Sequence, residues 1–118
     1  MDTQMLLENM VKLSCKITVY IPSTVNINQQ IDNTWYVDKC ATLFANCFGG
    51  ATSTETLGYW TSPTMGLVKE RSTMVFAYCT TDQASQHFDK VYMFCKDMKK
   101  ELAQDSIALE YNGEMYFV

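Results

Sequence analysis

Histidine and closely spaced cysteines, the residues from which zinc sites are built, are scarce in this sequence. There is one histidine, His87, and the five cysteines form no C-x-x-C pair, so the ligand spacing of a zinc site is absent. No bound metal or other cofactor is therefore expected. An odd set of cysteines on apolar faces is typical of small buried hydrophobic residues in a reducing cytoplasm. They are Cys15, Cys40, Cys47, Cys79 and Cys95.

Positive charge and long apolar runs are also in short supply. Nine Lys and Arg residues stand against thirteen Asp and Glu, a formal net charge of −4, which argues against direct nucleic-acid binding. Residues 1–13 lack a basic leader segment and carry Glu8 inside their apolar run, so neither a signal peptide nor a membrane span is predicted. The sequence indicates a cytoplasmic protein whose N-terminal arm, residues 1–13, is either frayed or a short helix.

What remains is the composition of an ordinary folded domain. Hydrophobic residues make up 47% of the 118 residues and charged residues 19%, which is too apolar for a disordered chain. The length suits one domain around one core. We therefore expect residues 1–118 to form a single domain.

Hydrophobic periodicity predicts the elements of the N-terminal half. A strand is expected over 15–21, where β-branched residues alternate with others until Pro22 removes a ladder donor. A helix follows, with Asp32 or Asn33 as its N-cap and apolar residues three and four apart. The pair Gly49-Gly50 ends that helix.

The C-terminal half is predicted to hold a hairpin, a helix and a second hairpin. Strands over 51–60 and 67–79 are joined by a loose loop at 61–66. A helix capped by Asp82 follows, and the dipeptide Asn112-Gly113 favours a tight turn between the last two strands. The apolar stripe of that helix is the strongest periodic signal in the chain. Its residues are Ala84, Phe88, Val91, Cys95, Met98 and Leu102.

This order of elements, βαββαβ with one more strand, predicts an α+β fold of the ferredoxin-like type. An antiparallel sheet then carries both helices on one face, with its first and third strands central. The residues of 67–79 do not reveal which face the helices cover. The other face must stay polar or be buried against a second copy, so we expect self-association as a homodimer.

Four short motifs occur in the order in which a known family carries them. They are FGGAT at 48–52, GYW at 58–60, GLVKERS at 66–72 and QDSIAL at 104–109. The combination resembles the domain of unknown function 3574 family, which shares the G-x-W, E-x-S and Q-[ED]-S-[VI] patterns. The resemblance covers about residues 31–110. It implies the ferredoxin-like fold and no particular activity.

Glu70 and Ser72 form the first candidate binding site. They lie two apart on one predicted strand, so their side chains point to the same face. A carboxylate beside a hydroxyl could bind a polar ligand or act as a base. The alternative is that Glu70 belongs to a solvated end of the hairpin with cross-strand charge pairs.

Aromatic residues at the end of the neighbouring strand are further candidates. Tyr59 and Trp60 either close the core, line a pocket or anchor an interface. Thr52 shares a strand face with Trp60, and Gly58 leaves space beside that ring. We therefore add Thr52, Tyr59 and Trp60 to the candidate binding residues.

Other polar motifs have ordinary structural explanations. Gly49-Gly50 matches no phosphate-binding loop, and His87 has no catalytic partner evident in the sequence. The polar segment 22–33 leads into a helix N-terminus, where it binds an anion or satisfies its own backbone. The side chains in question are Ser23, Thr24, Asn26 and Asn28.

Without a catalytic constellation, the first functional hypothesis is a non-enzymatic binding module that self-associates and recruits a protein partner. Two alternatives stay open. Short Met- and Tyr-rich sequences without enzyme motifs are typical of phage and plasmid products, which favours a counter-defence factor of the anti-CRISPR kind that blocks a host immune complex. The other alternative is a small enzyme that uses Glu70 with His87 or a tyrosine.

Overall fold

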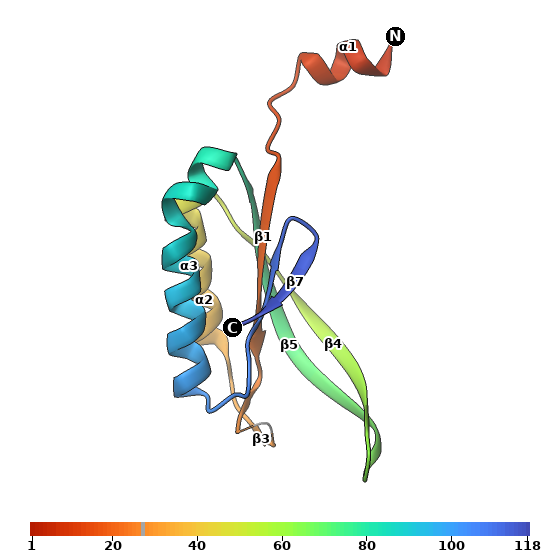
Figure 1. Cartoon of the computed structure of the whole chain (residues 1–118), viewed down its shortest axis with the longest axis vertical. Coiled ribbons are helices and arrows are strands. Elements are labelled where there is room, and N and C mark those ends of the chain that lie inside the picture. The colour runs from red at the N-terminus through yellow and green to blue at the C-terminus, as the bar shows by residue number, and fades with distance from the viewer. Residues whose placement is uncertain (27) are drawn as a thin grey trace.

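An antiparallel five-stranded sheet with two helices on one face forms the body of the protein, as the computed structural model shows (Figure 1). The structure describes residues 1–26 and 28–118. The sheet order is β4-β5-β1-β6-β7, so the predicted ferredoxin-like α+β fold is confirmed. The elements are α1 (Thr3–Glu8), β1 (Cys15–Pro22), β2 (Thr24–Val25), β3 (Gln29–Gln30), α2 (Thr34–Phe48), β4 (Thr52–Ser62), β5 (Gly66–Cys79), α3 (Thr81–Glu101), β6 (Ala108–Tyr111) and β7 (Glu114–Phe117).

Helix α2 begins and ends at the predicted residues. At its start, however, the side chain that accepts a backbone hydrogen bond is that of Asp32, and Asn33 occupies the N-cap position. The carboxylate of Asp32 accepts a hydrogen bond from the backbone N–H of Thr34 at 2.9 Å, and the Thr34 hydrogen bonds lower the pKa of Asp32. Asn33 occupies the N-cap position without capping through its side chain; its amide instead donates to the hydroxyl of Thr73 at 3.1 Å. Gly49 ends the helix in the left-handed conformation, with φ of 90°, which favours glycine.

The N-cap predicted for α3 was wrong by two residues. Thr80 caps the helix, because its hydroxyl accepts from the backbone N–H of Gln83 at 3.1 Å and the Gln83 side chain accepts from the backbone N–H of Thr80 at 2.9 Å. This reciprocal pair is a capping box. Asp82 lies inside the first turn of the helix, where a negative charge is favourable without capping.

The core lies between the helices and one face of the sheet. On β5 that face carries Thr73, Val75 and Ala77, which are buried together with Cys40 and Phe44 of α2. All five cysteines are buried, as predicted. Burial raises the pKa of the Cys95 thiol to about 12 and that of Cys40 further still, so these two side chains act as neutral hydrophobic groups.

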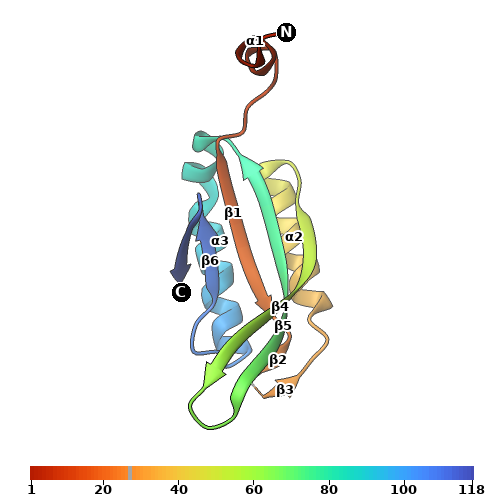
Figure 2. The ribbon, with the colours of Figure 1, turned by 90° about the vertical axis from the view of Figure 1, so that its right-hand side faces the viewer.

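The opposite face of the sheet, here called the open face, is not covered by α2 or α3 (Figure 2). Thr18 at its centre is nevertheless fully buried, and its hydroxyl donates to the carboxylate of Glu110 at 2.8 Å. The ammonium of Lys16 lies 4.0 Å from the same carboxylate and 4.9 Å from the centroid of the Phe76 ring. A belt of mixed polar and aromatic side chains therefore crosses this face.

Two hairpins differ in extent from their predictions. Pairing between β4 and β5 continues to Ser62 and Gly66, so residues 63–65 form a short connection where a loose loop over 61–66 was expected. The β4–β5 hairpin reaches past the helices (Figures 1 and 2). At the C-terminal hairpin, Asn112 and Gly113 both have positive φ, 51° and 84°, as a type I′ turn requires.

The N-terminal arm contains α1, the short-helix alternative of the prediction. Figures 1 and 2 both show α1 beyond the end of the sheet, joined to β1 by an extended link. Within the described residues, none of the helices has both the length and the apolar character of a membrane span.

Candidate functional site

A cavity of about 330 Å³ opens on the open face, where β1, β5 and the connection between α3 and β6 meet. It gathers residues that are far apart in the sequence because β1 lies between β5 and β6 in the sheet. Its walls combine charged, polar and aromatic side chains. The lining residues are Tyr20, Pro22, Thr24, Gly58, Glu70, Arg71, Ser72, Gln104, Asp105, Ser106, Ile107 and Ala108.

Glu70 is fixed in this cavity by a neighbour on the adjacent strand. The indole N–H of Trp60 donates to the Glu70 carboxylate at 3.0 Å. Gly58 pairs directly with Glu70 across the two strands, and a Cβ added to Gly58 would lie 3.7 Å from the Glu70 carbonyl oxygen. That distance is an ordinary contact, so the glycine opens room for a ligand beside Glu70 without being sterically required.

Ser72 lies on the same face of β5 as Glu70, as predicted, and both line the cavity. The Ser72 hydroxyl is 2.6 Å from the hydroxyl of Thr56 on β4. Thr56 also donates to the backbone carbonyl of Ser72 at 3.2 Å. Ser72 is thus held by the hairpin and has capacity left to contact a ligand.

The connection between α3 and β6 is fastened beside β1 by Gln104. Its side-chain amide donates to the carbonyls of Thr24 at 3.0 Å and Leu102 at 3.1 Å. The two residues that follow, Asp105 and Ser106, are exposed and line the cavity. Glu70 and Asp105 therefore bring two carboxylates to the cavity. Arg71 also lines it, although strand alternation places its side chain on the face of β5 opposite to Glu70.

The structure separates other candidates from this site. Tyr59 points to the opposite face of β4 from Trp60, where the Lys69 ammonium lies 6.0 Å from its ring centroid. Thr52 pairs with Phe76 at the far end of β4. These two residues do not join the cavity of Glu70, because strand alternation and distance along β4 keep them apart.

His87 is also remote from Glu70. It lies on α3, on the helix side of the sheet, with Nδ1 3.2 Å from the Lys90 ammonium and its ring 6.2 Å from that of Phe48. An enzyme using Glu70 with His87 is therefore not supported by the geometry. The cavity instead places Glu70 with Tyr20, the tyrosine form of the same alternative.

The polar segment 22–33 adjoins the site, although Ile27 lies outside the described residues. A neighbouring cavity of about 370 Å³ is lined in part by Ser23, Thr24 and Asn28 and shares Glu70 and Arg71 with the first. Ser23 accepts a hydrogen bond from the Asn33 amide at 3.2 Å, and the backbone N–H of Asn26 donates to Leu102. Within the segment itself, the backbone N–H of Ile31 donates to the carbonyl of Ser23 at 2.9 Å, so part of its backbone is satisfied internally.

Several of the lining residues were given no binding role from the sequence, among them Tyr20, Gln104 and Asp105. Tyr20 belonged to the alternating pattern of the first strand and was not considered as a binding residue. Gln104 and Asp105 stood in the QDSIAL motif and were not assigned a role. These three residues lie near Glu70 only because of the order of strands in the sheet. A local sequence pattern does not encode that order.

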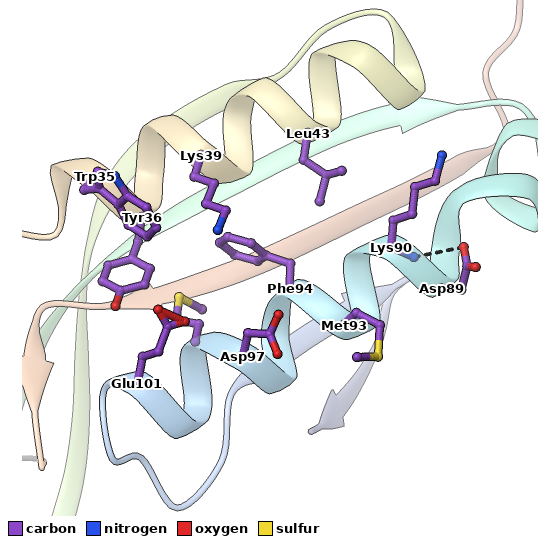
Figure 3. Close-up of a pocket in the computed structure, with 11 residues that line it drawn as sticks. Trp35, Tyr36, Lys39, Leu43, Asp89, Lys90, Met93, Phe94, Asp97 and Glu101 are labelled. Atoms are coloured by element: carbon purple, nitrogen blue, oxygen red, sulfur yellow. Dashed lines mark hydrogen bonds between the residues drawn. The ribbon is translucent and has the colours of Figure 1, made fainter.

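A third cavity, of about 360 Å³, lies between α2 and α3 (Figure 3). The Tyr36 side chain reaches toward Glu101 across it, and burial, followed by the Glu101 charge, raises the pKa of Tyr36. Lys39 faces the Trp35 ring at 4.7 Å. None of the residues that line this cavity was a sequence candidate. Among the described residues, no group of three or more His, Cys, Asp and Glu side chains is placed to hold a metal ion.

No protein-family model and no curated protein sequence matches this chain. Two solved structures match over nearly its whole length. A phage SAM lyase in complex with S-methyl-5'-thioadenosine has a TM-score of 0.64 and 15% identity, covering 95% of this chain and 94% of that chain. A phage SAM lyase in the apo state has a TM-score of 0.61 and 15% identity, covering 92% and 94%. At this identity the likeness shows a shared fold.

The comparison corrects the first functional hypothesis. Two solved structures that share this fold over almost the full chain are those of an enzyme, so the prediction of a non-enzymatic binding module was wrong. The counter-defence alternative gains no support either. The phage origin of the neighbours agrees with the phage-like style noted in the sequence, and the resemblance to the domain of unknown function 3574 family stays a prediction.

Proposed function

We propose that this protein is a lyase that cleaves S-adenosylmethionine and releases S-methyl-5'-thioadenosine. The observation that carries the proposal is the cavity on the open face, in which the Glu70 carboxylate is held at 3.0 Å by the Trp60 indole N–H. The fold around that cavity is shared with phage SAM lyase. The proposal makes specific the earlier alternative of a small enzyme that uses Glu70 with His87 or a tyrosine. The tyrosine is Tyr20.

The charges of the cavity complement those of S-adenosylmethionine. This substrate carries a positive sulfonium, a positive ammonium and one carboxylate. Glu70 and Asp105, which both line the cavity, supply two negative groups for the two cations. The ring of Tyr20, which lines the cavity, offers a surface for the adenine or for the sulfonium.

The proposed reaction breaks the bond between the sulfonium sulfur and the γ-carbon of the methionine part. The electron pair of that bond moves to sulfur, so the leaving group is the neutral thioether S-methyl-5'-thioadenosine. In the same step the four-carbon fragment either loses a β-proton to a base such as Glu70, the C–H electron pair forming the Cβ–Cγ double bond, or is attacked at its γ-carbon by its own carboxylate, which closes a lactone. Neither route consumes water, as lyase chemistry requires.

Conversion of the substrate by the purified full chain tests this function. Incubation with S-adenosylmethionine should yield S-methyl-5'-thioadenosine on liquid chromatography with mass spectrometry. NMR of the second product separates the two routes, because the unsaturated amino acid and the lactone are isomers. Glu70→Gln should lower kcat about 100-fold, a loss typical for a positioned carboxylate, with little change in Tm.

Glu55→Gln is the matched control. Glu55 is exposed, lies on β4 in the same hairpin and pairs with Thr73, so its side chain is on the face opposite to Glu70. Its replacement should leave kcat unchanged. Absence of any thioadenosine product with the wild-type protein, or full activity of Glu70→Gln, would overturn the proposal.

A further inference from the structure

The N-terminal arm exposes apolar side chains to solvent in the isolated chain. Every residue from 1 to 14 is exposed, and the hydrogen bonds described for residues 2–10 stay within the arm. A six-residue helix is not stable alone in water, so α1 needs a surface to pack against. Its apolar side chains and those that follow it are Met5, Leu6, Leu7, Met10, Val11 and Leu13.

A groove of suitable character lies on the helix side of the sheet edge, between α3 and the C-terminal hairpin. Its volume of about 590 Å³ exceeds that of each cavity described above. Its lining includes Phe88, Tyr92, Tyr111 and Tyr116, and every side chain described in its wall is uncharged. The rings of Phe88 and Tyr111 meet edge to face at 5.2 Å. An apolar occupant therefore fits this groove, and a charged peptide or a nucleic acid does not.

We propose that the arm of one copy docks into this groove on a second copy, and that the arm of the second copy docks into the groove of the first. Figures 1 and 2 show that the arm leaves the end of the sheet and points away from its own body, which places α1 where it can reach a neighbour. Each chain carries both the arm and the groove, so the exchange is self-complementary and closes as a two-fold dimer.

The area that such an exchange buries is large enough for a stable dimer. Burying one Leu or Met side chain removes about 100 Å² of apolar surface. Six such side chains from each of two arms remove on the order of 1,200 Å², with the groove surface in addition, which reaches the range of specific protein interfaces. The exchange does not depend on the proposed lyase activity.

Photo-crosslinking of the full chain tests the exchange. A benzophenone amino acid replaces Leu7 on α1, and the protein is irradiated and analysed by denaturing gel and peptide mass spectrometry. The expected product is a covalent pair of copies, joined from position 7 to peptides of α3 or the C-terminal hairpin. The same probe at Leu67, an exposed residue of the β4–β5 hairpin, should give no adduct in the groove.

Two neighbouring residues of β7 provide a matched pair of variants. Tyr116 lies in the groove and Met115 points to the open face, and the two are 49% and 47% exposed. Tyr116→Glu should lower the yield of crosslinked pairs about tenfold, because it places a carboxylate in an apolar contact, while Met115→Glu leaves it unchanged. An adduct within one copy, an adduct elsewhere on the second copy, or none at all would overturn the exchange.

Discussion

The carboxylate of Glu70 depends on a residue of the neighbouring strand for its position. Glu70 is on β5 and Trp60 is on β4, and the two side chains meet diagonally on the open face. The indole N–H is a donor that cannot also accept, so a carboxyl oxygen of Glu70 is the acceptor in this contact. Trp60 is 43% exposed and does not support the core. We therefore assign it as a positioning residue for Glu70.

Replacing Trp60 by Phe separates this role from simple packing. The variant keeps an aromatic ring and removes the N–H donor, so kcat for S-adenosylmethionine cleavage should fall about tenfold, the effect of losing one hydrogen bond to a charged group at an exposed site. KM should change much less, as measured by steady-state kinetics. Tyr59→Phe, on the other face of β4, is the control and should match wild type. Equal kcat values for Trp60→Phe and wild type would show that the bond has no part in turnover.

At the scale of elements, hydrophobic periodicity predicted most of the helices and strands. It did not predict the N-cap of α3 or the buried face of β5, which depend on individual hydrogen bonds. The apolar stripe of α3 was placed correctly because helical spacing is a strong signal. Its N-cap was misplaced because Thr80 and Asp82 are both capping residue types, and only the position of Gln83, three residues after Thr80, selects the first. The pattern along β5 could not choose the buried face, since Thr73 is polar yet buried through its bond to Asn33.

The candidate site was predictable only in part for a different reason. Alternation along one strand placed Glu70 and Ser72 on a common face. The arrival of Tyr20 and Asp105 beside them requires β1 to lie between β5 and β6, which is a tertiary property. His87 was considered as a partner of Glu70 because no sequence signal showed that α3 covers the opposite face.

The start of α2 should make stability depend on pH through Asp32. Its hydrogen bonds from Thr34 lower its pKa below the usual 3.8. A carboxyl whose pKa is lowered on folding stabilises the protein above its unfolded-state pKa, and this stabilisation is lost as the pH falls through the folded-state value. Asp32→Ala should therefore lower Tm at pH 7, and the difference from wild type should shrink below pH 3.8. Thermal unfolding followed by circular dichroism measures both.

Asp38→Ala is the control for this pH dependence. Asp38 is an exposed aspartate inside α2, and alanine is the better helix former there, so this variant should not lower Tm at pH 7. A Tm difference for Asp32→Ala that stays constant down to acidic pH would show that the carboxylate charge does not stabilise the helix start.

At the scale of the whole molecule, a single helix layer leaves one sheet face to be covered by something else. Met74 and Phe76 of β5 are half-buried on that face, and Lys16 lies against Phe76. The cavity of Glu70 opens on the same side. Association of two copies through the open face would bury these side chains and exclude water from the cavity, which strengthens electrostatic interactions with a cationic substrate. The predicted self-association would therefore strengthen binding of the proposed substrate.

Met74→Lys should weaken this association, because it places an ammonium in a contact that is apolar when covered. Light scattering after size-exclusion chromatography should give wild type an average mass above the 13.5 kDa of one chain, and the variant a lower mass at equal concentration. Met93→Lys is the control, since Met93 is exposed on the outer surface of α3, away from both proposed contacts. The arm exchange lies on the helix side of the sheet, so its crosslink should persist in Met74→Lys. An unchanged mass for Met74→Lys would exclude the open face as the contact, and a strictly monomeric wild type would exclude both surfaces.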